Sequence, residues 1–189
     1  MDKVTCKKCI LDSETPGVTI HPETGLCQFC GEFTPLPKEK KDEFRVRMDS
    51  LLKSPPSQGT YDVIFALSGG IDSSYALYRL KKDYPGLRIL AVQFDNGFIS
   101  ETALENARRF CEITGSTYMH LTLDQNALND TFLRAARSTN AFPASARYRA
   151  SDICNVCISI VKQKIIGLAI STGSPFVVFA FSPGQTDAP

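Results

Sequence analysis

Hydrophobic and polar residues divide this chain into two parts of different character. Residues 1–35 show little apolar periodicity, whereas from residue 61 onward short apolar runs alternate with longer amphipathic segments. Short runs rich in β-branched residues predict buried strands, and the longer segments predict helices. We expect strands over residues 63–67, 88–94, 117–122 and 176–181, and helices over residues 38–53, 73–84, 100–114, 126–138 and 158–172.

This alternation predicts an α/β fold with a doubly wound parallel sheet, in which ligands bind at the carboxyl ends of the strands. A charged, helix-forming segment precedes it and ends in the linker-like sequence Ser-Pro-Pro-Ser-Gln-Gly. We therefore expect a small N-terminal ribbon at residues 1–35, a helical linker at residues 36–60 and a nucleotide-binding domain at residues 61–189.

Composition limits the classes of protein that fit. The chain has 189 residues, a net charge of +1 and 43% hydrophobic residues, which is typical of a globular protein without a global basic field. No apolar run approaches the length that spans a bilayer, and the N-terminus does not resemble a signal peptide. We expect a soluble, cytoplasmic protein with no membrane partner. Seven cysteines in such a chain favour metal or redox chemistry over disulfides.

The strand predicted at residues 63–67 stops abruptly at the sequence Ser-Gly-Gly-Ile-Asp-Ser-Ser. A buried strand that passes through a glycine turn into a helix N-terminus is a phosphate-binding construction, because the backbone can approach an anion that the first helical N–H groups face. The lysine of a Walker loop is missing. An ordinary strand-to-helix turn with two glycines is the alternative. The phosphate-binding interpretation predicts nucleotide contacts from Ser68, Gly69, Gly70, Ile71, Asp72, Ser73 and Ser74.

This motif resembles the PP-loop of the N-type ATP pyrophosphatase superfamily. The resemblance implies an adenine nucleotide alpha hydrolase-like fold and an enzyme that cleaves ATP between the α- and β-phosphates to adenylate a substrate. The Gly69 and Gly70 amides and the serine hydroxyls would hold pyrophosphate oxygens. Asp72 would orient the loop or help to hold Mg²⁺, which neutralises charge on the scissile phosphates. Asp72 and Ser73 are therefore our candidate catalytic residues in the loop.

Polar segments also follow two other predicted strands. Asp95-Asn96-Gly97 comes after the second strand, and Ser-Pro-Gly-Gln-Thr-Asp at residues 182–187 comes after the last. Because the carboxyl ends of parallel strands meet at one edge, we expect Asp95, Gly184 and Asp187 to approach the nucleotide. A simple polar turn after a strand explains Asp95 equally well.

Four N-terminal cysteines form the pattern C-x₂-C-x₁₇-C-x₂-C. Each C-x₂-C pair is a tight turn whose thiolates can face one ion, and two such turns complete a tetrahedral zinc site. Because about 35 residues cannot build a core, the metal would supply much of the folding free energy of this segment. A disulfide framework is the competing interpretation. We predict a structural zinc ribbon held by Cys6, Cys9, Cys27 and Cys30.

A third C-x₂-C motif, Cys154 and Cys157, opens the helix that leads into the last strand. Thiols at a helix N-terminus have depressed pKa values and are good ligands or nucleophiles. Three roles are open: two ligands of an iron–sulfur cluster, a redox or persulfide pair, or buried structural cysteines. A cluster needs a third ligand, and the one spare cysteine, Cys111, is expected to be a core residue on a helix.

Three features in this order resemble the tRNA 2-thiouridine synthetases: the double C-x₂-C, the PP-loop, and a C-x₂-C before the last sheet helix. Lys162, Ala169 and Gly173 also lie at compatible spacing. The resemblance implies that ATP activates a base carbonyl of tRNA as an adenylate, AMP leaves, and sulfur from a donor replaces oxygen. Cys154 and Cys157 would then act in catalysis, by holding an iron–sulfur cluster or by carrying sulfur.

The last loop departs from that family, whose pattern has a Gly-His-Asn-x-x-Asp-Asp-type segment there. Residues 182–187 lack the His-Asn pair and carry one aspartate. The chain then stops at residue 189, where the family continues with further helices and a third cluster cysteine. We expect the nucleotide-binding domain to be truncated at this end.

The opening of the chain also resembles the N-acetyl sugar amidotransferases, on the segments at residues 6–12, 15–18 and 25–30. That resemblance implies adenylation of an amide or carbonyl oxygen of a sugar and delivery of ammonia by a partner. The two families agree on the ATP chemistry and differ in the nucleophile. A module that binds adenine nucleotides without turnover is a third possible class of function. A homodimer is also compatible with the sequence.

Overall fold

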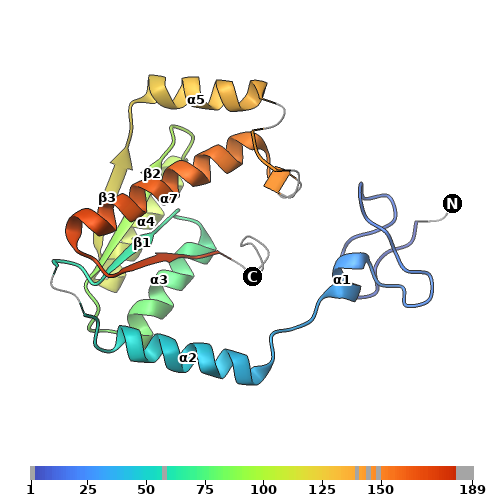
Figure 1. The fold of residues 1–189 in the computed structure, drawn as a ribbon, viewed down its shortest axis with the longest axis horizontal. Helices are drawn as coiled ribbons and strands as arrows, with labels where there is room; N and C mark the ends of the chain where they lie inside the picture. Colours follow the sequence, from blue (N-terminus) through green and yellow to red (C-terminus); the bar gives the residue numbers. More distant parts are fainter. Residues whose placement is uncertain (1–2, 57–58, 139–140, 144–145, 148–149, 182–189) are drawn as a thin grey trace. The chain divides into compact units, whose positions relative to one another are not determined.

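The structure, a computed structural model, describes residues 3–56, 59–138, 141–143, 146–147 and 150–181. The chain divides into two compact units, Met1–Met48 and Asp49–Pro189 (Figure 1). The division falls inside helix α2, Lys38–Leu52, which lies within the segment expected to be a linker.

The first unit contains two tight hairpin-like turns, one short helix, α1, Gln28–Glu32, and the N-terminal part of α2. Isolated antiparallel bridges join Thr5 to Asp12 and Ile20 to Cys27. The only buried hydrophobic side chains among its described residues are Cys6 and Cys27. Apolar burial of this size cannot offset the entropy of ordering the segment, so another interaction must stabilise it.

The second unit is built on a four-stranded parallel sheet in the order β3-β2-β1-β4 (Figure 1). The register pairs Ala66 with Val92 and with Phe179, so β1, β2 and β4 end at the same edge. This parallel sheet with flanking helices confirms the α/β fold class expected from the alternation. The strands are β1, Val63–Ala66; β2, Ile89–Asp95; β3, Thr117–Thr122; and β4, Phe176–Phe179.

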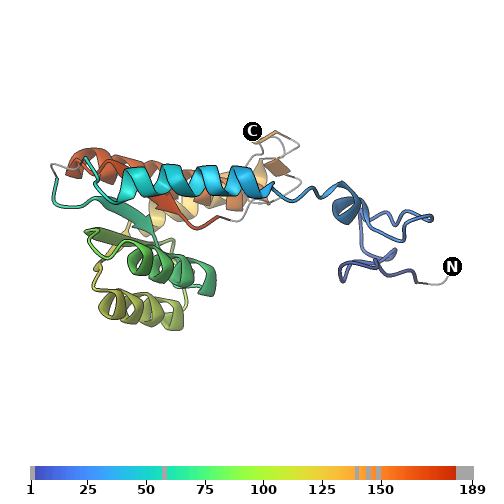
Figure 2. The same ribbon diagram turned by 90° about the horizontal axis from the view of Figure 1, so that it is seen from below.

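Helices cover both faces of this sheet (Figure 2). Successive residues of a strand point to opposite faces, so Phe65 packs in a cluster with Leu77 and Ala107, whereas Ile64 packs in a second cluster with Ile165. The first cluster lies under α3 and α4, and the second lies under α7. The helices are α3, Ile71–Asp83; α4, Glu101–Thr114; α5, Gln125–Arg137; and α7, Asp152–Thr172.

An ion pair with a buried carboxylate joins the strands at the edge opposite the expected site. The Asp62 carboxylate accepts hydrogen bonds from the Arg88 guanidinium at 2.6 and 3.1 Å and from the Arg88 backbone N–H at 2.8 Å. The Asp62 side chain is 5% exposed and the Arg88 side chain 51%, and the hydrogen bond that Arg88 donates to Asp62 raises the pKa of Arg88. This pair fixes the entries of β1 and β2 side by side.

Two helix starts differ from the sequence-based expectation. Helix α3 begins at Ile71, two residues early, and α7 begins at Asp152, six residues before the predicted start. The Ser151 hydroxyl caps α7 by accepting a hydrogen bond from the Cys154 N–H at 3.2 Å. The third C-x₂-C therefore occupies the first two turns of the helix.

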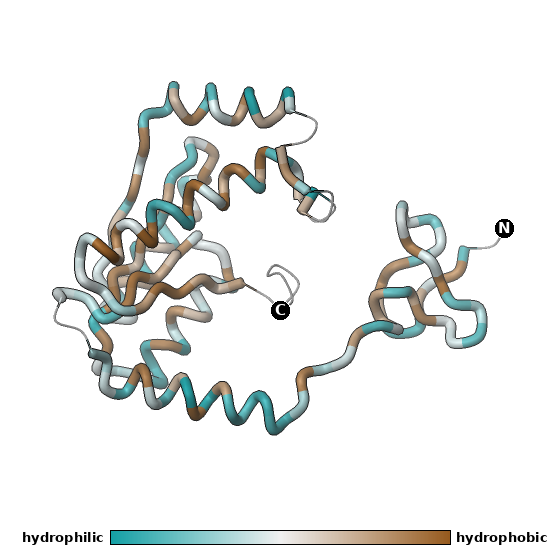
Figure 3. The backbone as a smooth tube through the Cα atoms, in the orientation of Figure 1, coloured by the Kyte–Doolittle hydropathy of each residue, from teal (hydrophilic) through white to brown (hydrophobic). Residues whose placement is uncertain are grey.

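The expectation that no apolar run approaches membrane length was wrong for α7. By length and composition alone this 21-residue helix could cross a membrane, and hydrophobic positions run along most of it (Figure 3). In this structure Ile165 and Ala169 pack against the sheet, while Ile166 and Ile170 are 47% and 77% exposed. A helix that covers a parallel sheet has the same composition, so the signal for a membrane span is weak.

Candidate functional site

The loop that joins β1 to α3 has the geometry of an anion cradle. The Ser73 hydroxyl lies 3.2 Å from the Ser68 backbone N–H, 2.9 Å from the Ser68 hydroxyl and 3.2 Å from the Gly70 carbonyl oxygen. These bonds hold the loop closed across the start of α3, whose first-turn N–H groups have no helical partners. The loop thus presents backbone donors and the positive end of a helix dipole at the carboxyl edge of the sheet.

The two glycines of the loop serve different purposes. Gly69 has φ of +78°, and a Cβ there would lie 2.1 Å from the Ala103 carbonyl oxygen of α4, so the fold itself requires glycine. Gly70 has φ of −79° and caps α3; a Cβ there would meet only the Ser68 hydroxyl, at 3.3 Å. Gly70 is exposed, so its missing side chain leaves room outside the protein, where a ligand can approach the backbone.

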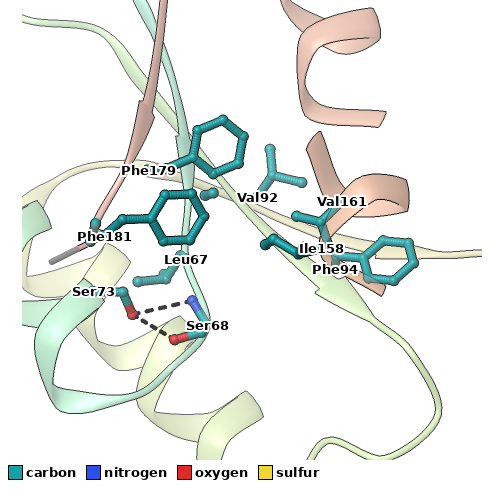
Figure 4. Close-up of a pocket in the computed structure, with 11 residues that line it drawn as sticks. Leu67, Ser68, Ser73, Val92, Phe94, Ile158, Val161, Phe179 and Phe181 are labelled. Carbon is teal, nitrogen blue, oxygen red and sulfur yellow. Dashed lines mark hydrogen bonds between the residues drawn. The ribbon is translucent and has the colours of Figure 1, made fainter. Parts of the chain in front are cut away.

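A cavity of about 190 Å³ opens beside the loop (Figure 4). Ser68 and Ser73 form its polar end, and its walls are apolar side chains from β2, α7 and the end of β4. The Phe179 and Phe181 rings stack at 5.3 Å, and the Lys162 ammonium lies 5.6 Å from the Phe181 ring centre. An apolar slot with a polar end suits a flat base joined to phosphates.

Asp95 lies at the carboxyl end of β2, as expected, but its carboxylate is already engaged. Its Oδ1 accepts a hydrogen bond from the Gly97 N–H at 2.7 Å, and its Oδ2 lies 3.0 Å from Nε2 of His120 on β3. The register of β2 and β3, which the sequence does not reveal, brings this pair together.

Cys157 and Cys154 differ in their surroundings. Cys157 is half-buried against Phe94 and Phe132, and its Sγ lies 3.5 Å from the side-chain amide nitrogen of Asn96. Cys154 is exposed at the start of α7. Ile158, the residue after Cys157, lines the cavity. The two thiols therefore lie near the carboxyl edge of the sheet, beside the cavity.

The remaining cysteine of the α/β unit, Cys111, is a core residue. It is 2% exposed and packs under α3 and α4, on the face of the sheet opposite α7. Burial raises the pKa of its thiol to about 11. Cys111 therefore has the properties of a small apolar residue and lies away from Cys154 and Cys157.

Two expected contacts lie outside the described residues. These are Gly184 and Asp187, which belong to residues 182–189. Asp72 and Ile71 are both exposed in the first turn of α3, whereas Ser73 and Ser74 are buried. Of the expected nucleotide contacts, Ser68 and Ser73 line the cavity, and the others that are described lie around the loop or at the end of β2.

The four N-terminal cysteines converge on one point. Their Sγ atoms all lie within 4.8 Å of one another, and Cys9 Sγ is 3.7 Å from Cys27 Sγ. A disulfide would require about 2.05 Å. A tetrahedral ion with Zn–S bonds of about 2.3 Å places its sulfurs about 3.8 Å apart. The spacing fits a single thiolate-bound metal ion.

The electrostatics of this cluster also indicate a cation. The Cys27 N–H donates to Cys6 Sγ at 3.3 Å, and this bond lowers the pKa of Cys6 to about 6. The neighbouring Cys9 sulfur, together with burial, raises the pKa of Cys30 to about 12. One thiol is thus prepared as a thiolate while another resists ionisation beside it. A divalent cation removes this conflict because it stabilises all four thiolates.

Comparison with known proteins gives few relatives in sequence. No protein-family model matches the chain. The uncharacterized protein MJ1599 of Methanocaldococcus jannaschii is 23% identical over 173 residues, which are 92% of this chain and 57% of that protein. The chain therefore spans little more than half the length of this relative.

Several solved structures resemble the chain, all at low identity. The NH3-dependent NAD synthetase from Campylobacter jejuni has a TM-score of 0.48 and 20% identity, over 75% of this chain and 56% of that one. The U34-tRNA thiolase NcsA from Methanococcus maripaludis, solved with its [4Fe-4S] cluster, has a TM-score of 0.48 and 18% identity, over 94% and 54%. The NMN synthetase from Francisella tularensis has a TM-score of 0.47 and 17% identity, over 76% and 54%.

Proposed function

We propose that this chain is the ATP-binding part of a cytoplasmic PP-loop ATP pyrophosphatase that adenylates a carbonyl or amide oxygen. The observation that carries the proposal is the loop at residues 68–74. It follows a buried strand, is closed by Ser73, opens α3, and flanks an apolar cavity at the carboxyl edge of the sheet. In this proposal residues 1–35 are a zinc ribbon, residues 36–60 a helical linker and residues 61–189 the nucleotide-binding domain.

Each loop residue has a role in this chemistry. The Gly69 and Gly70 amides and the Ser68, Ser73 and Ser74 hydroxyls hold the β- and γ-phosphates, while the base occupies the apolar part of the cavity. The exposed Asp72 would hold Mg²⁺, which when bound supplies charge neutralisation to the leaving pyrophosphate. Lys162, beside Phe181, adds a positive charge at the rim.

The nucleophile that replaces the activated oxygen is proposed to be sulfur, with a tRNA base as the acceptor. Support comes from the exposed Cys154 and the half-buried Cys157, in the first two turns of α7 and near the cavity. Cys154 and Cys157 would carry sulfur from a donor or ligate an iron–sulfur cluster.

The metal of the first unit is proposed to be zinc. Four thiolates at tetrahedral spacing leave no open position for a substrate, so its role is structural. When bound, the ion stabilises the two tight turns that lack an apolar core. It takes no part in ATP cleavage.

One observation favours ammonia as the nucleophile instead, with an N-acetyl sugar as the acceptor. Among the residues described, only the four N-terminal cysteines gather as three or more metal-ligating side chains. Cys154 and Cys157 therefore have no third ligand in that part of the chain. An amidotransferase has no need of one, because its two thiols would serve only in packing.

The ATP chemistry is tested by measuring the release of AMP from ATP in the presence of an acceptor (tRNA or an N-acetyl sugar) and the matching donor of sulfur or ammonia. The identity of the nucleophile is tested with the double variant Cys154→Ala/Cys157→Ala. The account predicts that the double variant still binds ATP but forms no thiolated product. Cys111→Ala is the matched control, since Cys111 lies on the other face of the sheet. Normal turnover by the double variant would exclude sulfur and favour ammonia. If the wild-type protein released no AMP with a tRNA acceptor and a sulfur donor, and none with an N-acetyl sugar and ammonia, both the sulfurtransferase and the amidotransferase would be excluded. A module that binds adenine nucleotides without turnover would then be favoured.

A further inference from the structure

A buried glutamine, Gln93, lies directly beneath the loop. Its side chain is fully buried in β2, on the face of the sheet that α3 and α4 cover. The amide nitrogen donates to the Ser68 carbonyl oxygen and to the Ala103 carbonyl oxygen, each at 3.2 Å. Both amide hydrogens are thus used, and they connect the strand, the loop and α4 through one side chain.

A second residue fixes which way this amide points. The Tyr118 hydroxyl of β3 donates to the Gln93 amide oxygen at 2.7 Å. Burial raises the pKa of Tyr118, so its hydroxyl keeps the proton that it donates. With its oxygen held by Tyr118, the amide must turn its nitrogen toward the loop. The orientation is therefore set by the hydrogen-bond network itself.

The consequence for the loop follows from the planarity of the peptide bond. The Ser68–Gly69 peptide is trans, and in a trans peptide the carbonyl and the N–H point in opposite directions. Because Gln93 holds the Ser68 carbonyl toward the core, the Gly69 N–H points away from it, to the side where a phosphate would lie. Gly69 is also pressed against the Ala103 carbonyl, the other acceptor of Gln93.

We propose that Gln93 is a positioning residue of the nucleotide site, which holds the Gly69 N–H in the orientation that binds phosphate. This inference rests on the proposed function, since it assumes that the loop binds the phosphates of ATP. Without the two donors of Gln93, the Ser68 carbonyl loses the group that holds it toward the core, so the orientation of the Gly69 N–H is less firmly fixed. A buried network that is fully satisfied gives such a loop one conformation.

The test is titration of the whole chain with pyrophosphate and with ATP, by calorimetry and by the amide NMR signal of Gly69. Gln93→Met keeps the shape of the side chain and removes both donors. We expect roughly 10- to 100-fold weaker binding, the range for loss of a hydrogen bond to a charged group, and a much smaller Gly69 shift on adding pyrophosphate. Thr114→Val is the control, because its buried hydroxyl bonds only within α4 and to Ser116.

Thr114→Val should lower the melting temperature without changing either titration. If Gln93→Met also lost only thermal stability and bound both ligands like the wild type, the inference would be overturned. Should Gln93→Met not fold, Tyr118→Phe serves the same purpose: binding weakened by a few-fold supports the inference, and unchanged binding contradicts it. A wild-type chain that bound neither ligand would instead overturn the proposed function.

Discussion

The two units of this chain reach a folded state by different means. Among the described residues of the first unit, the buried hydrophobic side chains are two cysteines whose thiols belong to the metal-ligating group. The second unit buries β1 and most of β2 between helices and adds an ion pair at one edge of the sheet. This difference indicates that the first unit, which lacks an apolar core, depends on one bound ligand for its stability. The layered second unit distributes its stability over many contacts.

The largest expected effect on stability comes from removing the metal of the first unit. Cys6→Ser removes one of four ligands, and because structural zinc contributes roughly 10–16 kcal/mol in small zinc domains, the first unit should unfold. The α/β unit should keep its melting transition. Elemental analysis and hydrogen exchange of each unit measure this.

Cys154→Ser is the control for that experiment, since it removes an exposed thiol outside the cluster. It should leave one zinc per chain. A first unit that kept its exchange protection in Cys6→Ser, or freshly purified wild-type protein without zinc, would contradict the proposed dependence on the metal.

The next largest effect is expected at Asp62, the buried carboxylate of the ion pair in the α/β unit. Asp62→Ala leaves the Arg88 backbone N–H and guanidinium without their acceptor and should cost about 2–3 kcal/mol of unfolding free energy. Urea denaturation measures it. Asp83→Ala, which breaks the exposed pair with Arg79, should change the value by less than about 0.5 kcal/mol. Equal effects of the two variants would show that burial of Asp62 does not matter.

The smallest effect concerns pH. The pKa of Cys111 is raised to about 11 in the folded state from 9.0, so its contribution to stability is complete below pH 9 and is lost as the pH rises through 11. Between pH 8 and pH 10 the unfolding free energy should fall by about 1 kcal/mol more in the wild type than in Cys111→Ala. If the unfolding free energy depended on pH equally in the two proteins, the thiol of Cys111 would not be buried and neutral in the folded state.

Local sequence signals predicted the elements and the loop well. The apolar run before Ser68, the capping residue Ser100 and the glycines after α4 and α7 all act on their immediate neighbours, so they can be read without knowledge of the fold. The range predicted for α7 began too late because Asn155 and two cysteines interrupt the apolar pattern there, although the expectation that the third C-x₂-C opens this helix was confirmed.

Contacts between strands could not be predicted in the same way. In the sequence, Gln93 is a single polar residue within an apolar segment that predicts a buried strand. Its partners Ser68 and Tyr118 are each 25 residues distant in the chain. The pair of Asp95 with His120 is equally distant. Such contacts depend on strand order and register, which a single sequence does not specify.

The most direct test of the account is calorimetric titration of ATP with Mg²⁺ into the wild-type chain and into Gly70→Ala. The structure leaves room for this methyl group apart from the Ser68 hydroxyl at 3.3 Å, so the variant should fold like the wild type. The methyl group would occupy the place where a phosphate meets the backbone. We expect binding by the wild type and a loss of at least about tenfold in Gly70→Ala, whose melting temperature should fall only slightly because alanine is a poorer N-cap than glycine. Equal affinity in the two proteins would contradict the assignment of the loop at residues 68–74 as the phosphate site.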